Sequence, residues 1–483
     1  MRSKRIIGLL GLLGILNSAI AQTGLHTLPL GGLSNPVTNA YGFAAVGINP
    51  SLLALPLPGK EFAGPASRWA GTGEETIEKS ARLSLGIAEF ALAGYVQALN
   101  KRDFNDVVFN RLINQNFRMT LQEKREFAQQ FSRTAISLDW RFTWLGVSFR
   151  DKRSKWGVGA SIRDEFTFYL FMDSFVTHLA FLGLNYEYFD TFYVTPQGDT
   201  VAWTTNPIKF SEAMGDTRLY LSQTRKLSIG GSYQVFANKE IQAWAGLGIN
   251  YIMGFSYGEA YATPDGIIAH GATAYITDSF TLAVDTANKR SFIELDPLAT
   301  GISIDIGGVV RYKQNLMIAF SLINMGSLNW KQHVIRLEDA LIDTLISYQG
   351  PGSTGNIGGG WSEIYRFTTL KQQLPVTFQI GATYQAMKML SVTGFLSVPV
   401  RKVVGFLPEF RAGVIFQPIN LVTVETGFGI GGRYPFRIPL ALRFGLGPRA
   451  NWQIGVATYD FLGIWRNRGP LYSLGLAFLR LQF

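Results

Sequence analysis

Residues 471–483 read LYSLGLAFLRLQF and end on a phenylalanine. Side chains in a β-strand alternate between two faces, so this stretch predicts one apolar face opposite Arg480 and Gln482. The expected apolar face comprises Ala477, Leu479, Leu481 and Phe483. Such a terminal strand is typical of an outer-membrane barrel, whose last strand closes against the first and leaves no unpaired edge in lipid. A soluble β-sandwich can also end on an apolar strand, so the rest of the chain must decide.

The first 21 residues have the features of a secretory signal peptide. A basic start and an apolar stretch at 6–16 precede a small-x-small cleavage site at 19–21, so the mature chain is expected to begin near Gln22. The chain has no cysteine, which excludes lipidation after the cleavage site and disulfides. No other stretch approaches the ~18 to 20 apolar residues of a spanning helix. These features leave a periplasmic protein, a secreted protein or an outer-membrane barrel.

The composition favours the barrel. Charged residues make up 16% of the chain, below the ~25% of soluble domains, while aromatic residues make up 13% and glycines number 52. Of the net charge of +10, three basic residues lie in the signal peptide, which leaves +7. That charge suits contact with anionic lipid head groups, or it reflects only a lumen and loops rich in Arg and Lys. Interfacial aromatic girdles are expected from Trp140, Trp144, Trp156, Trp330, Trp452 and Tyr472.

Alternation of apolar and polar residues recurs along the chain at the ~9 to 11 residues of a membrane-spanning strand. The fourteen predicted segments are 81–97, 134–149, 155–170, 217–237, 240–257, 300–312, 315–323, 373–385, 389–400, 407–417, 420–431, 436–447, 451–459 and 470–483. In the first segment Glu89 falls in phase with Leu85 and Ile87, which predicts a β-bulge. The pattern predicts an all-β, antiparallel transmembrane barrel of about fourteen strands.

The connections alternate in length, as they do in barrels with short periplasmic turns and long surface loops. Connections after even-numbered segments are tight, whereas several after odd-numbered segments span thirty to fifty residues. With both termini periplasmic the strand number must be even. The extracellular loops are expected to contain short helices, including one at Leu121–Phe131 that begins with a capping box of Thr120 and Glu123.

Residues 22–80 lie outside the alternating segments that are predicted to form the barrel wall. They precede the first strand and are rich in Gly, Pro, Ala and Leu, too apolar for a disordered tail. We expect them to fold into the lumen as a plug. The chain is therefore divided into a signal peptide (1–21), a plug (22–80) and a barrel (81–483).

Within the plug region, residues 39–54 read NAYGFAAVGINPSLLA. This stretch resembles the N-terminal hatch of the FadL-like long-chain fatty acid transporters, especially their Bacteroidota variants, which include secretion-associated members. Asn49 and Pro50 match the family's early Asn-Pro-Ala element, in which Ser51 replaces the usual Ala, and Leu53 matches the Leu-Leu-Ala that follows this element in the Bacteroidota variant. The resemblance implies that residues Asn49, Pro50, Ser51, Leu52 and Leu53 bind ligand or gate the lumen; a well-formed turn that only seals the lumen is the alternative. Pro50 fixes its own φ and biases Asn49 toward extended geometry, and Asn49 can cap the turn.

Enzymatic chemistry finds no support in the sequence. The four histidines are far apart without metal-ligand spacing, no G-x-S-x-G elbow occurs, and residues 350–360 lack the Gly-Lys-Ser/Thr of a phosphate loop. We therefore expect no catalytic residues, metal or cofactor, and no nucleic-acid partner. The expected surroundings are outer-membrane lipid and lipopolysaccharide.

Two functions follow for a protein of the bacterial outer membrane. The first is FadL-like uptake or binding of hydrophobic small molecules, captured between the loops 98–133 and 170–216. The second is a barrel that transports nothing and serves as a subunit or platform of another outer-membrane complex for secretion or assembly. Loop stretches 170–216, 258–300 and 324–372 favour the second, because they are longer than a small-molecule gate requires.

Overall fold

The computed structural model describes most of residues 33–483. The described ranges are 33–55, 82–98, 121–182, 189–196, 200–273, 296–313, 315–339, 341–348, 356–358, 365–387, 389–401, 403–405, 407–419, 421–432, 434, 436–446, 452–465 and 471–483. The predicted signal peptide (1–21), both flanks of the predicted plug (22–32 and 56–80) and the predicted capping residue Thr120 lie outside these ranges.

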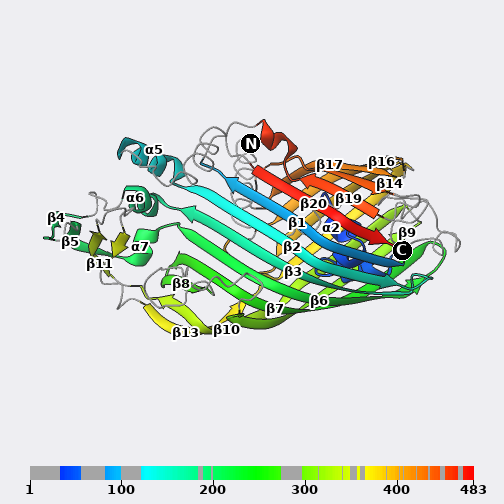
Figure 1. Ribbon diagram of the computed structural model, residues 1–483, viewed down its shortest axis with the longest axis horizontal. Coiled ribbons are helices and arrows are strands. Elements are labelled where there is room, and N and C mark those ends of the chain that lie inside the picture. Colours follow the sequence, from blue (N-terminus) through cyan, green and yellow to red (C-terminus); the bar gives the residue numbers. More distant parts are fainter. Residues whose placement is uncertain are drawn as a thin grey trace, which may run out of the picture.

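The strands form a closed, antiparallel transmembrane barrel (Figure 1). The last strand, β20, pairs along its length with the first, β1, as the terminal strand predicted. Fourteen successive positions make up the wall, and in order around the barrel they are β1 (Leu83–Val96), β2 (Thr134–Arg150), β3 (Trp156–Met172), β6 (Arg218–Ala237), β7 (Ile241–Thr263), β9 (Ala299–Tyr312), β10 (Leu316–Leu337), β14 (Thr377–Met387), β15 (Leu390–Pro399), β16 (Glu409–Ile419), β17 (Val422–Gly431), β18 (Leu440–Leu446), β19 (Trp452–Thr458) and β20 (Leu471–Gln482).

The same sheet contains 16 strands because two of the wall positions are each built from two pieces. β8 (Gly266–Thr273) pairs with both β7 and β10 and so continues the position of β9. β13 (Tyr365–Gln373) pairs with the distal part of β10 and continues the position of β14. Pro375, which has no backbone N–H for a ladder, lies in the short break between β13 and β14. The predicted count of about fourteen strands is confirmed for the closed wall.

Side-chain alternation sorts the two faces of the wall as the sequence predicted. In β9, Ile302, Ile304 and Ile306 are 60%, 41% and 44% exposed on the outside. The intervening Ser303 and Asp305 are buried in the lumen. The same division recurs in β14 and β2, so the outer face is apolar and the inner face polar.

Where β1 and β20 meet, each strand has two consecutive outward-facing residues, and the alternation of inward and outward side chains changes phase there. Ala88 has a positive φ of 56°, and Ile87 and Ala88 are both exposed, so the next residue, Glu89, turns into the lumen. The change of phase that the sequence indicated at this point is present, but β1 keeps its register with β2 and β20 across it, so the predicted β-bulge with its extra residue was wrong. On β20 the predicted face of Ala477 was wrong: Ala477 is buried, while Phe478 and its neighbour Leu479 are both exposed.

The two rims of the barrel differ (Figure 1). The short-turn rim, beside the C-terminus, has tight connections such as 151–155 and 238–240. The loop rim, at the opposite end, carries a 4-stranded accessory sheet and short helices. These elements are β4 (Thr191–Val194), β5 (Thr200–Lys209), β11 (Leu341–Tyr348), β12 (Asn356–Gly358), α5 (Leu121–Phe131), α6 (Ser174–Leu182), α7 (Phe210–Met214) and η7 (Phe461–Ile464). The predicted helix at Leu121–Phe131 is confirmed as α5.

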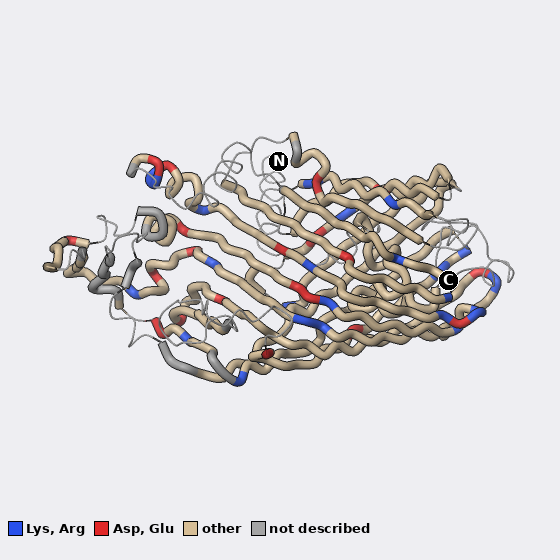
Figure 2. Tube along the Cα trace, in the orientation of Figure 1, with Lys and Arg blue, Asp and Glu red and all other residues tan. Residues whose placement is uncertain are grey.

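The predicted loops contain more sheet than expected. We expected strands to end at residues 257 and 323, but β7 continues to Thr263 and β10 to Leu337. A register shift between Leu322 and Met325 bends β10, which then resumes pairing with β9 beyond it. Figure 2 shows charged residues at both rims and at scattered positions midway along the wall strands. Within the described ranges, no helix has the length and apolar character needed to cross a membrane.

Candidate functional site in the barrel lumen

Residues 33–55, the inner segment, lie inside the barrel. They form α2 (Pro36–Asn39), η2 (Gly42–Ala45) and η3 (Pro50–Ala54), which contact wall strands from β1 round to β14. The segment carries no charged residue, and nearly all of it is buried. A buried, irregular backbone must have its polar groups satisfied by the surrounding protein. The contacts of the inner segment with the wall therefore decide whether it can stay in the lumen.

The five predicted site residues lie together at the C-terminal end of the inner segment. Asn49 precedes η3, and its Oδ1 accepts hydrogen bonds from the backbone N–H of Ser51 (3.2 Å) and from Ser51 Oγ (2.6 Å). The predicted cap is confirmed. Asn49 Nδ2 donates to the carbonyl of Val37 (3.0 Å) and thereby joins η3 to α2. Pro50 begins η3, and Leu52 and Leu53 are buried in one apolar cluster with Val37 and Val46. Their role in ligand binding or gating stays a prediction.

A groove of glycines in the wall receives this end of the inner segment. A Cβ on Gly157 would lie 2.2 Å from the carbonyl oxygen of Leu53, and one on Gly246 would lie 2.2 Å from the backbone nitrogen of Ser51. On Gly307 it would lie 1.9 Å from Asn49 Oδ1. Farther along, Phe43 fills the space above glycines of β1 and β2. Only glycine permits backbone and side chains to approach the strands this closely. The members of the groove are Gly86, Gly146, Gly157, Gly159, Gly230, Gly246 and Gly307.

Polar side chains hold the other end of the inner segment. The backbone N–H and hydroxyl of Ser34 both donate to Glu425 Oε1, at 2.7 and 2.5 Å. Asn35 Nδ2 donates to two strand carbonyls of β14 and β15. Tyr41 donates to Gln453 (2.8 Å) and accepts from Arg443 Nη1 (2.7 Å). These hydrogen bonds satisfy polar groups of an irregular segment that has no ladder of its own.

A second segment also folds inward, namely the described residues of 432–439 between β17 and β18, called here the inward connection. Arg437 is buried there and forms an ion pair with Glu409 of β16. Tyr434 donates to Asp139 of β2 (2.6 Å). Arg411 joins the two segments, because it binds both carboxylate oxygens of Glu409 and donates to the carbonyl of Leu33 (2.6 Å). The predicted strand 436–447 therefore begins only at residue 440.

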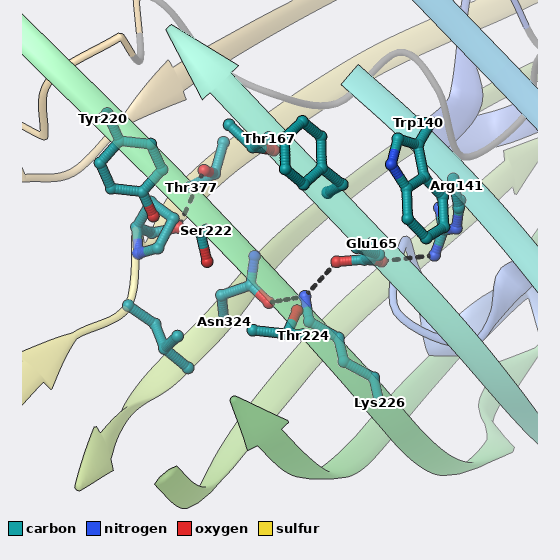
Figure 3. A pocket seen from close by; sticks show the side chains of 13 residues that line it. Trp140, Arg141, Glu165, Thr167, Tyr220, Ser222, Thr224, Lys226, Asn324 and Thr377 are labelled. Carbon is teal, nitrogen blue, oxygen red and sulfur yellow. Dashed lines mark hydrogen bonds and ion pairs between the residues drawn. The ribbon is translucent and has the colours of Figure 1, made fainter. Parts of the chain in front are cut away.

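On the loop-rim side of the inner segment lies a small polar cavity (Figure 3) of about 60 Å³. Glu165 stands in its centre and forms ion pairs with Arg141 (2.8 Å) and Lys226 (2.7 Å). Lys226 also donates to Asn324 Oδ1 (3.3 Å). The other lining residues are Trp140, Phe166, Thr167, Tyr220, Ser222, Thr224, Leu374, Pro375 and Thr377.

Local irregularities of the strands place these side chains. Asn324 sits at the register shift of β10 with a positive φ of 60°, which Asn tolerates better than most residues. Its backbone N–H donates to Asp305 (2.7 Å) while its side chain faces Lys226. Arg163 lies two residues before Glu165 and donates from Nη2 to the carbonyl of Val46 (2.6 Å). The cavity and the inner segment are thus joined through one arginine.

An apolar cluster borders the cavity toward the loop rim. Trp330 is buried and stacks on Tyr257 with ring centroids 5.6 Å apart, and its indole N–H donates to Gln372. The predicted girdle position of Trp330 was therefore wrong, because the extension of β10 carries it inside. Tyr220 and Leu374 belong both to this cluster and to the cavity lining. The cluster, called here the apolar mouth, comprises Tyr220, Ile252, Tyr257, Ala272, Ala299, Leu328, Trp330, Val334 and Leu374.

Sequence reasoning missed the glycine groove, the cavity and the inward connection. A signal for the groove was available, since Gly157, Gly159, Gly230, Gly246 and Gly307 all fall at lumen-facing positions of consecutive wall strands. The charged cavity had a weaker signal in the run Arg163, Asp164, Glu165. Among the described residues, no group of three or more His, Asp or Glu side chains is arranged to hold a metal ion.

Comparison with known proteins gives a family and a set of similar folds. Residues 80–454 match a family described as a family of unknown function, DUF5723. No curated protein is significantly similar in sequence to the chain.

Among solved structures, the chain is similar to the Ralstonia pickettii toluene transporter TbuX, at 10% identity and TM-score 0.44, covering 96% of this chain and 98% of that chain. The Pseudomonas putida toluene transporter TodX matches at 10% identity and TM-score 0.43, with 96% and 98% covered. A Pseudomonas aeruginosa FadL homologue matches at 9% identity and TM-score 0.41, with 96% and 97% covered.

Proposed function

Because the chain belongs to DUF5723, a family whose function is unknown, we propose a function from its own lumen: uptake of hydrophobic small molecules. The barrel resides in the bacterial outer membrane, where its apolar outer face meets lipid and lipopolysaccharide. The short-turn rim faces the periplasm and the loop rim the exterior. The inner segment is the plug that gates the lumen.

The observation that carries this proposal is the order of environments along the lumen. The apolar mouth around Trp330 and Tyr257 borders the polar cavity at Tyr220, and Arg163 connects the cavity to the inner segment. The side chains of this mouth are buried, so a hydrophobic molecule that enters between them gains ~25 cal/mol for each Å² of its apolar surface removed from water. The inner segment has no charged residue and no disulfide to the wall, so it is the part of this path that can move aside.

Uptake of labelled toluene and oleate by cells that produce the full chain tests the proposal. We expect uptake above that of cells with an empty vector. Trp330→Ala should lower the affinity for the compound by roughly tenfold or more, because one large apolar side chain is lost from the mouth. Trp452→Ala, which removes an exposed tryptophan near the short-turn rim, is the matched control and should leave uptake unchanged.

Wild-type uptake equal to that of the empty vector would contradict the proposal. If the protein then also co-purified in fixed ratio with another outer-membrane protein, the platform function would replace it. Equal effects of the two tryptophan variants would show that the apolar mouth is not where the compound binds.

A further inference from the structure

The cavity contains hydrogen-bond donors that the protein leaves unused. Arg141 is only 5% exposed, and its Nη2 binds Glu165, but its buried Nε and Nη1 have no hydrogen-bond partner. The ammonium group of Lys226 has three N–H donors and contacts two acceptors, Glu165 and Asn324. The hydroxyls of Ser222 and Thr224 line the same space. Buried donors without acceptors are costly, so the site is suited to a ligand that brings acceptors.

The charges around the cavity do not balance. Arg141 and Lys226 line it together with a single carboxylate, Glu165. In the next layer Arg163 interacts electrostatically with Glu165, Asp305 and Glu89, of which Glu89 is already neutralised by its ion pair with Arg480 (2.7 Å). The neighbouring Arg225 is already neutralised by its ion pair with Asp164 (2.7 Å). Three cations against Glu165 and Asp305 leave one positive charge, and a buried charge is stable only when it is paired.

The size of the cavity limits the ligand. Its volume is about 60 Å³, several times the ~10–15 Å³ that one water molecule needs. A volume of this size fits an ion of a few heavy atoms. The donors come from two strands, Arg141 from β2 and Lys226, Ser222 and Thr224 from β6, which suits an anion with two oxygen acceptors better than a spherical one.

We propose that this cavity is a binding site for a small monovalent oxyanion of the size of formate or acetate. The ion accepts hydrogen bonds from Arg141 and Lys226 and neutralises the excess positive charge beside Arg163. This site adjoins the apolar mouth, with which it shares Tyr220 and Leu374, but its occupation does not depend on the uptake of hydrophobic molecules.

Calorimetric titration of sodium formate into the purified, folded protein tests the site, in a buffer whose only anion is gluconate, which is too large for the cavity. We expect one saturable site in the wild type. Arg141→Gln should weaken binding by roughly tenfold or more. Arg311→Gln is the matched control: Arg311 is also 5% exposed with an unpartnered Nη2, but it lies on β9 outside the cavity lining.

Thr224→Val provides a second variant that preserves shape and removes only a cavity hydroxyl, and it should weaken binding severalfold. The absence of saturable formate binding to the wild type would overturn the proposal, since the cavity would then hold water only. Equal weakening by the Arg141 and Arg311 substitutions would overturn the assignment to this cavity. Chloride binding as tight as formate would overturn the oxyanion assignment.

Discussion

The two segments that fold into the lumen are held by opposite means. The inner segment carries no charged residue and fits a groove of glycines, while charged wall residues such as Glu425 and Arg163 form hydrogen bonds with it. The inward connection is anchored by Arg437, whose guanidinium is paired with buried Glu409. Moving a segment that carries no charge separates no ion pair, whereas moving the inward connection would break the buried ion pair of Arg437 and strand its charge. We therefore expect the inner segment to be the movable part and the inward connection the fixed one.

The largest effect is expected from removing the carboxylate that anchors the inward connection. Glu409→Gln leaves Arg411 and Arg437 buried without their carboxylate, which should cost roughly 3–5 kcal/mol of the free energy of unfolding. Denaturant titration of the barrel in lipid vesicles measures the loss. Glu240→Gln, at an exposed residue of the short-turn rim, is the control and should cost about 0–1 kcal/mol. Equal losses would show that the Glu409 cluster does not anchor the connection.

A smaller effect is expected from filling the glycine groove. Gly246→Val places side-chain atoms against the backbone of Ser51 and should destabilise the seat of η3 by roughly 1–3 kcal/mol. Amide hydrogen exchange of residues 49–54 should speed up by about ten- to hundred-fold, while barrel stability changes little. Gly394→Val is the control, because no atom lies within 4 Å of its Cβ position. Unchanged exchange at residues 49–54 would mean that the groove does not hold the segment.

A still weaker effect is expected from removing one hydrogen bond at the N-terminal, polar end of the inner segment. Thr38→Val removes the hydroxyl that contacts Thr383 (2.7 Å) without changing the shape of the side chain. A neutral hydrogen bond contributes about 0.5–1.5 kcal/mol, and Thr383 keeps its contact with Thr393. Exchange should rise at residues 35–41 and stay constant at residues 49–54. A rise at both ends would show that the inner segment opens as one unit.

The smallest effect concerns the accessory sheet of the loop rim. Asp190 accepts hydrogen bonds from the backbone N–H and hydroxyl of Thr205, both 2.7 Å, and these bonds lower the pKa of its carboxyl group. A lowered folded-state pKa contributes stability above the ordinary value of about 4, which is lost as the pH falls below it. Hydrogen exchange around residues 200–205 should therefore rise in acid. Asp190→Asn should remove this pH dependence; if it persists, another group is responsible.

The wall was predictable because side chains of a membrane-spanning strand alternate between lipid and lumen, and because short connections fall at one rim and long ones at the other. Ser303 and Asp305 between isoleucines could face only one way. The continuation of β10 to Leu337 was not predictable, since in its distal half the apolar Leu328 and Trp330 are buried in the mouth while Asn329 and Lys331 are exposed, the reverse of a lipid-facing strand. The cavity depends on partners far apart in the chain, such as Lys226 with Asn324, and no spacing rule reveals such pairs.

Single-channel conductance in planar lipid bilayers tests the central claim most directly. The wild type should stay closed or nearly closed, because the inner segment fills the lumen. A variant that lacks residues 33–55, with folding verified by heat-modifiable mobility on gels, should show a stable open pore, and Gly246→Val should open intermittently between these limits. Equal conductance of the wild type and the deletion variant would contradict the account, because the inner segment would then not be the gate.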